Sequence, residues 1–262
     1  MDLKLNNKIV FISGSSKGIG FETAKLFLDE GATVIINGRT EGSVQKALER
    51  LNSPKASGIA ADFINDKEIY KLIGKLTDID IDILVNNVGI FRGKNFYDAP
   101  DKDWSDHLQV NLLGGVKLSR HLLPKMIRKN WGRVIFVSSE CATLVPGDLL
   151  SYSVSKASVN VFSSGLAKLT KGTNVTVNTI IPGSTLSEGS KIFLKETAKR
   201  ESKTIKEVES NFFKDVRPSS LLGRFAKVEE VASTIVYISS PLASATNGAS
   251  IRVDGGSMGS VF

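Results

Sequence analysis

The segment that decides the fold of this chain is Ile9-Val10-Phe11-Ile12-Ser13-Gly14-Ser15-Ser16-Lys17-Gly18-Ile19-Gly20. Its first four residues are apolar and rich in β-branched and aromatic side chains, which is typical of a buried strand. The three glycines then allow a tight turn, a close approach of the backbone to a ligand, and the start of a helix. A strand, a glycine-rich turn and a helix in this order predict a site for the pyrophosphate of a dinucleotide. The turn alone is a weak signal, since any strand-to-helix turn can use glycine.

Short β-rich runs alternate with helical stretches along nearly the whole chain, which indicates βαβ units. Strands are predicted at 9–12, 33–36, 58–60, 83–85, 134–137, 175–179 and 250–253. Helices are predicted at 20–30, 42–51, 66–76, 103–129, 151–170 and 229–239. The pattern therefore predicts an α/β fold whose seven parallel strands are covered by helices on both faces.

One region, at about 184–220, breaks this alternation. It has amphipathic stretches among many Lys and Glu residues but no strand signal. A segment this long inside a compact domain is usually functional, so we predict a helical lid over a substrate pocket. The alternative is a surface excursion that serves subunit contact. The rest of the chain offers no linker, and we predict a single domain over residues 1–262.

Composition narrows the class of protein. The hydrophobic content of 41% and charged content of 23% are ordinary for a soluble globular protein. No signal peptide or membrane-spanning run is recognisable, so we expect a cytoplasmic protein with no membrane partner. Cys141 is the only cysteine, and His107 and His121 are the only histidines, which excludes disulfide frameworks, zinc clusters and His-based triads. We therefore predict no metal site.

The net charge of +7 does not indicate a nucleic-acid partner. The basic residues are spread over the predicted helices and mixed with acidic ones, and no basic motif is interleaved with aromatic residues. A solvated surface is the favoured interpretation.

The end of the second predicted strand bears on the choice of cofactor. Dinucleotide sites usually have an acid there that holds the ribose 2′-hydroxyl. This chain has Asn37-Gly38-Arg39-Thr40 instead, and Arg39 and Lys17 can face a 2′-phosphate. We therefore predict NADP(H) as the preferred cofactor, with NAD(H) possible. The alternative is that Arg39 is only a solvated turn residue.

Other strand ends carry polar or small residues that belong at the same edge of a parallel sheet. Asn86-Asn87-Val88-Gly89 ends the fourth strand, and Pro182-Gly183 follows the sixth, with Ser187 beyond. Asp62 follows the third strand and is placed to accept a hydrogen bond from an adenine amino group. Each could be a simple strand-end turn. Their recurrence at one edge favours a ligand site.

A candidate proton-transfer pair follows the fifth strand. Tyr152 and Lys156 are four residues apart and share a face of the predicted helix, and Ser139 lies thirteen residues before Tyr152. An ammonium on that face is expected to lower the pKa of the phenol by stabilising the phenolate. A tyrosine placed in this way can exchange protons near neutral pH.

Together these features resemble the short-chain dehydrogenase/reductase superfamily, over nearly the full chain from Lys8 to Gly256. Within it, the chain is similar to bacterial 3-oxoacyl-(acyl carrier protein) reductases. The resemblance is carried by Gly14, Gly18, Gly20, Asn86, Asn87, Gly89, Asn111, Ser139, Tyr152, Lys156, Pro182, Gly183 and Val253-Asp254-Gly255-Gly256. It implies a Rossmann-type doubly wound sheet and an NADPH-dependent oxidoreductase that reduces a ketone or 3-oxoacyl carbonyl to an alcohol.

The resemblance also implies the roles of individual residues. Tyr152 would be the general acid or base, and Ser139 would bind the substrate oxygen. Lys156 would lower the pKa of Tyr152 and bind the nicotinamide ribose, and Asn111 would hold a water linked to Lys156. The implied cofactor-binding residues are Gly14, Ser16, Lys17, Gly18, Ile19, Gly20, Arg39, Asp62, Phe63, Asn87, Gly89, Tyr152, Lys156, Pro182, Gly183, Thr185 and Ser187.

Departures from the family pattern are few. Ser13 stands where Thr is usual and Val88 where Ala is usual. Glu140 directly follows Ser139, and we expect it to face solvent because adjacent strand residues point to opposite faces. The alternative is that its carboxylate touches the active site.

Two other functions stay open at this point. One is an NAD-linked alcohol, polyol or steroid dehydrogenase, and the other is a catalytically silent nucleotide-sensing regulator. The expected partners are a small carbonyl or alcohol substrate and further copies of the chain. The resemblance implies a homotetramer or dimer, paired through the helices that begin near Asp103, Ser151 and Glu229.

Overall fold

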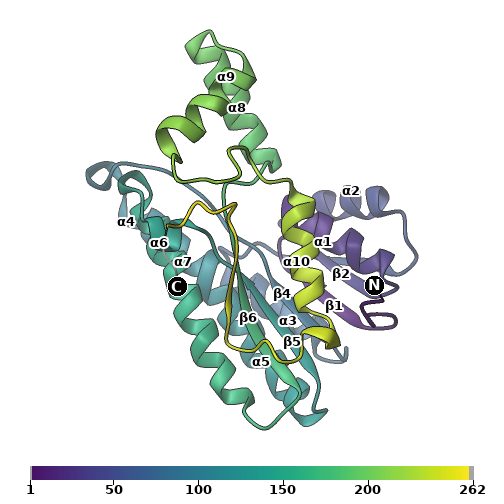
Figure 1. Ribbon diagram of the computed structural model, residues 1–262. Helices are drawn as coiled ribbons and strands as arrows, with labels where there is room; N and C mark the ends of the chain where they lie inside the picture. Colours follow the sequence, from purple (N-terminus) through teal and green to yellow (C-terminus); the bar gives the residue numbers. More distant parts are fainter. Residues whose placement is uncertain (1, 260–262) are drawn as a thin grey trace.

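Seven parallel strands form one sheet in the order β3-β2-β1-β4-β5-β6-β7 (Figure 1). This is a computed structural model that describes residues 2–259, so residues 1 and 260–262 of the predicted domain lie outside it. The strands are β1 (Ile9–Ile12), β2 (Thr33–Gly38), β3 (Ala56–Ala60), β4 (Ile83–Asn86), β5 (Gly132–Val137), β6 (Val175–Pro182) and β7 (Ser250–Val253). The order reverses between β1 and β4, which confirms the predicted Rossmann-type doubly wound fold.

Helices connect the strands in the predicted places. They are α1 (Gly18–Asp29), α2 (Glu41–Leu51), α3 (Asp66–Leu76), α4 (Asp101–Leu108), α5 (Gly114–Arg128), α6 (Cys141–Leu144), α7 (Leu150–Ala167), α8 (Glu188–Glu201), α9 (Ile205–Asn211) and α10 (Val228–Ile238). The predicted helix 103–129 corresponds to α4 and α5 joined by a π-helical turn, Gln109–Leu113. Such turns are frequent at functional sites. None of the helices described is long and apolar enough to cross a membrane.

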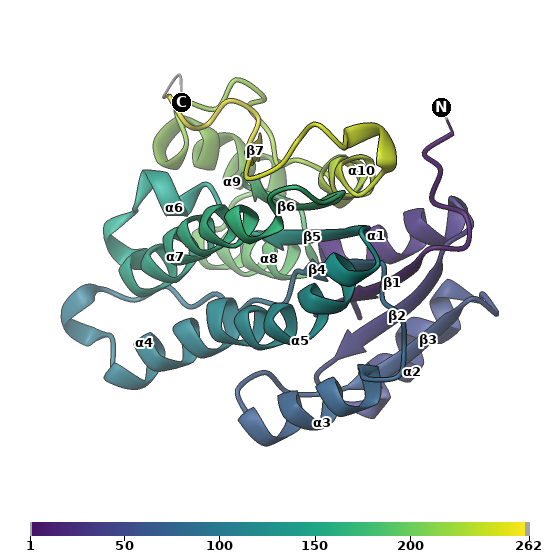
Figure 2. The same ribbon diagram turned by 90° about the horizontal axis from the view of Figure 1, so that it is seen from below.

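Alternating side chains of the buried strands divide the core into two layers. Phe11 and Leu84 pack with α3, α5 and α7 on one face, whereas Val10 and Ile12 pack with α1, α2 and α10 on the other. Figure 2 shows the two sets of helices on opposite sides of the sheet. Covering both faces in this way leaves the ends of the strands, where the connecting loops lie, as the place for a ligand.

The segment 184–220 forms α8 and α9, which project from the rest of the molecule (Figure 1). The N-terminus of α9 is fixed by a capping box between Thr204 and Glu207. The two helices enclose a small apolar core that is separate from the cores of the sheet and consists of Leu194, Ala198, Val208, Phe213 and Phe225. The helical character of the segment was predicted, and its role as a lid stays a prediction.

Strand β5, next to the middle strand β4, should contribute strongly to stability. Phe136 on β5 is 2% exposed and packs edge-to-face against Phe162 of α7. Phe136→Ala should lower the free energy of unfolding by about 3–5 kcal/mol, because it leaves a cavity between sheet and helix. Urea unfolding followed by circular dichroism measures this loss. The control Tyr97→Ala removes a ring that is 91% exposed and should change stability by less than about 0.5 kcal/mol. Equal losses of stability in the two variants would contradict the assignment of Phe136 to the core.

Candidate active site

The glycine-rich turn is built by close contact between the ends of β1 and β4. Gly14 has a φ of +62°, and a Cβ there would lie 2.7 Å from the Cα of Val88. The Ser13 hydroxyl accepts hydrogen bonds from the backbone N–H groups of Asn87 and Val88, at 3.0 and 3.1 Å. The Asn87 side chain donates to the backbone oxygens of Ser13 and Gly14. Asn87 therefore braces the turn, whatever contact it makes with a cofactor.

The start of α1 fits the pyrophosphate of a dinucleotide. Lys17 precedes the helix without capping it through its side chain, and the first turn contains no acidic residue. The first backbone N–H groups of a helix need acceptors, and the helix dipole favours an anion at this end. Within residues 2–259 no side chain caps this end, so it can receive a phosphate.

The end of β2 lies directly beside this turn. Asn37 is buried, and its side chain accepts from the Gly14 N–H at 3.0 Å and donates to the Ile59 oxygen at 3.0 Å. A Cβ at Gly38 would lie 3.1 Å from Ser16, so the strand end and the turn are in contact. Arg39 and Lys17 are both exposed at this edge. A strand end without an acid and with two cations nearby suits a 2′-phosphate.

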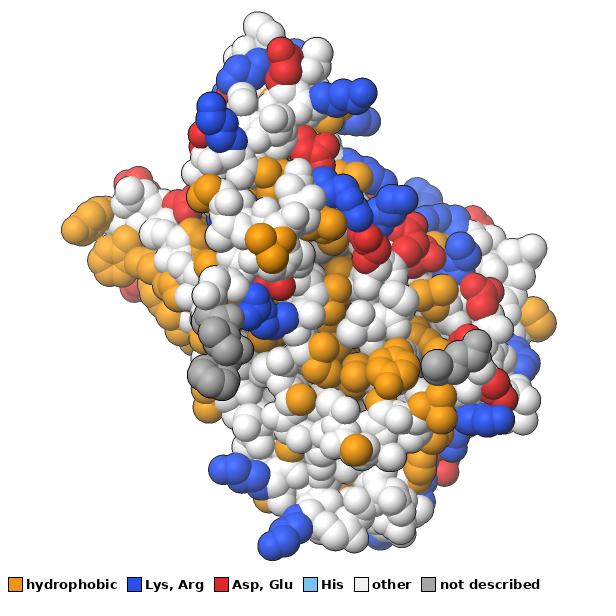
Figure 3. Space-filling model, viewed as in Figure 1, with side chains coloured by type: hydrophobic (Ala, Val, Ile, Leu, Met, Phe, Trp, Pro, Cys, Tyr) orange, Lys and Arg blue, Asp and Glu red, His pale blue; other side chains and the backbone are white. Residues whose placement is uncertain are grey.

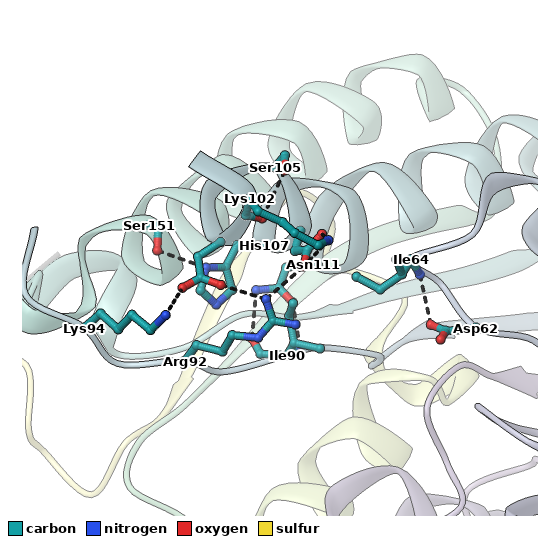
Figure 4. Close-up of polar contacts among 12 residues, drawn as sticks. Asp62, Ile64, Ile90, Arg92, Lys94, Lys102, Ser105, His107, Asn111 and Ser151 are labelled. Atoms are coloured by element: carbon teal, nitrogen blue, oxygen red, sulfur yellow. Dashed lines mark hydrogen bonds and ion pairs between the residues drawn. The ribbon is translucent and has the colours of Figure 1, made fainter. Parts of the chain in front are cut away.

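Asp62 and Phe63, two of the predicted cofactor-binding residues, both have structural roles. The Asp62 carboxylate accepts from the backbone N–H of Ile64 at 3.0 Å, well apart from the cluster around Asn111 (Figure 4). The Phe63 ring is buried in the core against Gly114. Any contact of Phe63 with a cofactor would therefore use its backbone.

Asn111 and Lys156 meet at Gly89. A Cβ at Gly89 would lie 3.3 Å from Lys156 Nζ and 3.4 Å from Asn111 Oδ1. The Asn111 side chain accepts from the Ile90 N–H at 2.8 Å (Figure 4). It also donates to the Ser155 hydroxyl at 2.9 Å. Asn111 lies in the π-helical turn between α4 and α5. The fold thus brings together three of the predicted residues that lie far apart in sequence.

Ser139 and Tyr152 form the other half of the predicted catalytic group. The Ser139 hydroxyl accepts from the backbone N–H of Cys141 at 3.2 Å, and it lies close enough to Tyr152 to favour the phenolate. Phe91 packs edge-to-face against the Tyr152 ring, with centroids 5.0 Å apart. Since the Cys141 N–H donates to the Ser139 oxygen, Ser139 keeps its own hydroxyl hydrogen as a donor toward Tyr152 or a substrate oxygen.

The pKa of Tyr152 shifts in the direction opposite to the expected lowering. Burial raises the pKa of Tyr152, which the neighbouring Ser139 hydroxyl only partly opposes, and burial lowers the pKa of Lys156 to about 8. Lys156 Nζ donates to the backbone oxygen of Val137 at 2.9 Å and lies 5.9 Å from the centre of the Tyr152 ring. Desolvation is therefore the largest cause of both pKa shifts.

Glu140 is buried, so the expectation that it faces solvent is wrong. Its carboxylate accepts from Arg217 Nε at 2.7 Å and from the Ser184 hydroxyl at 3.0 Å. The alternation rule fails here because β5 ends at Val137 and Glu140 already has the helical backbone angles that begin α6.

Sequence reasoning missed His107. It is fully buried on the helix face of Asn111, four residues earlier, and its Nδ1 lies 2.9 Å from the Ser151 hydroxyl (Figure 4). Its ring contacts Tyr152 edge-on with centroids 5.9 Å apart, and burial lowers its pKa. The four-residue spacing from Asn111 was the available signal.

The remaining predicted cofactor residues lie after β6 or in α1. Pro182 is the last residue of β6, and Gly183 packs on the backbone of Asp254. Thr185 forms a β-bridge with Ala226, and Ser187 caps α8. Ser187 and Glu188 also approach Gly18, which places this loop next to the glycine-rich turn. Ile19 packs against the α1 side of the core.

A Rossmann-type sheet whose carboxyl edge carries a glycine-rich turn and a Tyr/Lys pair defines an oxidoreductase that binds NAD(P). Residues 8–198 match the family model described as short chain dehydrogenase. The chain belongs to the short-chain dehydrogenase/reductase family, whose members act on CH–OH or C=O groups.

Similar proteins span essentially the whole chain. An uncharacterized oxidoreductase, YvrD, of Bacillus subtilis (strain 168) is 43% identical over 258 residues, covering 98% of each chain. The 3-oxoacyl-(acyl-carrier-protein) reductase FabG of Aquifex aeolicus (strain VF5) is 32% identical over 261 residues, covering 98% of this chain and 99% of the relative. The structure of L-sorbose reductase from Gluconobacter frateurii, complexed with NADPH and L-sorbose, superposes with a TM-score of 0.93, at 28% identity and full coverage of both chains.

The burial of Lys156 should lower the free energy of unfolding at neutral pH. Its pKa of about 8 lies below the ordinary 10.5, so between these values the unfolded chain binds a proton that the folded chain does not. The contribution of Lys156 to stability therefore rises from pH 8 to 10.5, and below pH 8 its burial opposes folding. Lys156→Met should not lower the thermal midpoint at pH 7, and it should flatten the rise between pH 8 and 10.5.

Thermal unfolding at a series of pH values measures both effects. Lys195→Met removes an exposed lysine and serves as the control, which should follow the unsubstituted protein. A large drop of the Lys156→Met midpoint at pH 7 would contradict the burial penalty.

Proposed function

We propose that this protein is an NADPH-dependent reductase that converts a carbonyl to an alcohol, with Tyr152 as the general acid. The observation that carries the proposal is the meeting of Lys156 and Asn111 at Gly89, together with the closeness of Ser139 to Tyr152. These groups lie at the carboxyl edge of the sheet that carries the glycine-rich turn.

The chain's own groups suit this chemistry. Bound NADPH would supply the hydride to the carbonyl carbon. Ser139 would donate a hydrogen bond to the carbonyl oxygen and fix its position. Tyr152, kept protonated at neutral pH by its raised pKa, would give its proton to that oxygen. Asn111 would hold the water through which Lys156 exchanges protons with solvent.

The proposed preference for NADP(H) over NAD(H) rests on the end of β2. The Asn37 side chain is hydrogen-bonded to the backbone of Gly14 and Ile59. Gly38 has no side chain. Arg39 and Lys17 are exposed at the same edge of the sheet. An NAD-linked dehydrogenase would be expected to keep an acid here.

Apolar groups around the site favour a moderately hydrophobic ketone or 3-oxoacyl compound. Phe91, which is 62% exposed, covers one edge of Tyr152. The segment 184–220, from here on the lid segment, would cover the other side. On the face that Figure 3 shows, its Lys and Arg side chains lie among acidic ones. The candidate lining residues are Phe91, Phe96, Leu144, Val145, Leu149, Leu150, Leu186, Ile192 and Phe193.

We also propose a homotetramer, or a dimer, that pairs through α7. Val161 on this helix is 75% exposed, and it forms a shallow apolar groove with Val154, Ala157 and Phe162. Sedimentation at micromolar concentration tests the assembly, and a monomer there would contradict it.

Removing the Tyr152 hydroxyl tests the reaction. Tyr152→Phe should lower kcat by about 10²–10⁴-fold, because the general acid is lost, while NADPH binding stays unchanged. NADPH oxidation is followed with a panel of 3-oxoacyl thioesters, ketones, ketoses, aldehydes and quinones. The control Tyr237→Phe lies on the exposed side of α10 and should retain full activity. Tight NADPH binding with no turnover of any compound would favour the nucleotide-sensing regulator.

Reversing the charge at Arg39 tests the cofactor. Arg39→Asp should raise the KM for NADPH about tenfold or more, since a charge-assisted hydrogen bond contributes about 1.5–3 kcal/mol. The KM for NADH should fall or stay constant. Lys46→Asp changes an exposed charge on α2 and controls for long-range effects. A preference of the unsubstituted protein for NADH would overturn the proposal in favour of an NAD-linked dehydrogenase.

A further inference from the structure

We propose that Glu140 and Arg217 form a positioning pair that couples both ends of the lid segment to the loop carrying Ser139. The inference rests on the proposed function, since it assigns a role in the same reaction. Neither residue touches the reacting atoms in this view, and both act through Ser139.

Glu140 binds both ends of the lid segment through one oxygen. Its Oε1 accepts from Ser184, where the segment begins, and from Arg217, near its end. Ser184 also accepts a backbone hydrogen bond, at 2.9 Å, from Ala226, which follows the lid segment. Glu140 is 2% exposed, and its Oε2 has no hydrogen-bond partner among the described residues. A buried carboxylate held in this way depends on Arg217 for its charge compensation.

Arg217 links Glu140 to the small core of the lid segment. Its Nη2 lies 3.7 Å from the sulfur of Cys141, so the guanidinium contacts two consecutive residues after Ser139. The guanidinium also lies 5.8 Å from the centre of the Phe212 ring, which stacks on Phe225. One side chain therefore connects the aromatic cluster under α8 and α9 with the start of α6.

The contact reaches Ser139 through the backbone of α6. Cys141 donates its N–H to the Ser139 hydroxyl, and Glu140 stands between these two residues. The Glu140 N–H is itself bound to the oxygen of Pro182 at 2.8 Å. A shift of the lid segment that pulls Arg217 would move Glu140 and Cys141, and with them the donor that orients Ser139. Small displacements of a group that fixes a reacting atom are costly in rate.

A double variant separates positioning from stability. Glu140→Gln and Arg217→Met each leave one buried partner uncompensated, so each should lower the thermal midpoint. The combination Glu140→Gln/Arg217→Met removes both charges and should recover most of the midpoint. If the pair only stabilised the fold, activity would return with stability. If the pair positions Ser139, kcat of the double variant should stay about 10–100-fold below that of the unsubstituted protein, while KM and NADPH affinity change little.

The matched control is the other Arg–Glu pair at this end of the lid segment. Arg224 and Glu230 form two hydrogen bonds at 2.9 and 2.8 Å, and both side chains are exposed. Arg224→Met/Glu230→Gln should leave kcat within about twofold, as expected for an exposed ion pair. A double variant of Glu140 and Arg217 with restored stability and unchanged kcat would overturn the inference.

Hydrogen exchange provides a readout that does not need turnover. Arg217→Met should speed amide exchange at residues 141–145, which lie more than seventy positions away in sequence, because their hydrogen bonds to Ser139, Glu140 and Cys141 depend on the same contact. Unchanged exchange there would overturn the coupling even if no substrate is found. Failure of Tyr152→Phe to affect turnover would instead refute the proposed function and leave this measurement valid.

Discussion

The close contact between the ends of β1 and β4 is the constraint on which the site depends. Gly14 packs against Val88 with no space for a side chain. The Asn87 side-chain amide donates hydrogen bonds to two backbone oxygens of the glycine-rich turn. This contact fixes where α1 begins and places the turn beside the end of β2. It also sets the position of Gly89, three residues after the end of β4, around which Asn111 and Lys156 gather. The proposed cofactor-binding edge and the proposed catalytic residues thus belong to one packed unit.

The site keeps two buried groups in states that cost free energy. Lys156 is buried and bound only to a backbone oxygen, and Glu140 keeps one carboxylate oxygen without a partner among residues 2–259. Purely structural packing would replace such groups with apolar ones. Their presence at the end of β5, on either side of Ser139 and Tyr152, is consistent with a site where reactivity takes precedence over stability.

The sequence predicted the fold well because each strand is a short apolar run and each helix repeats its apolar residues with helical spacing. It also predicted which residues gather at the sheet edge, since the ends of parallel strands meet there. It failed at Glu140, because the pleat of β5 stops three residues earlier and the alternation rule no longer applies. The direction of the Tyr152 pKa shift also differed from expectation, because burial is a property of the packed structure that the spacing of Tyr152 and Lys156 does not encode. The contact between His107 and Ser151 also joins distant segments, and the spacing of the residues did not predict it. The π-helical turn at Asn111 was likewise not predicted.

The separate apolar core of α8 and α9 has a consequence for the cost of substrate capture. A segment that ordered only on binding would lose about 1–2 kcal/mol of backbone entropy for each residue fixed. Because Leu194, Val208 and Phe213 already hold the two helices together, this segment, in its proposed role as a lid, would move as a preformed body. Closing over a substrate would then require little ordering free energy, so more of the binding energy would remain for orienting the carbonyl.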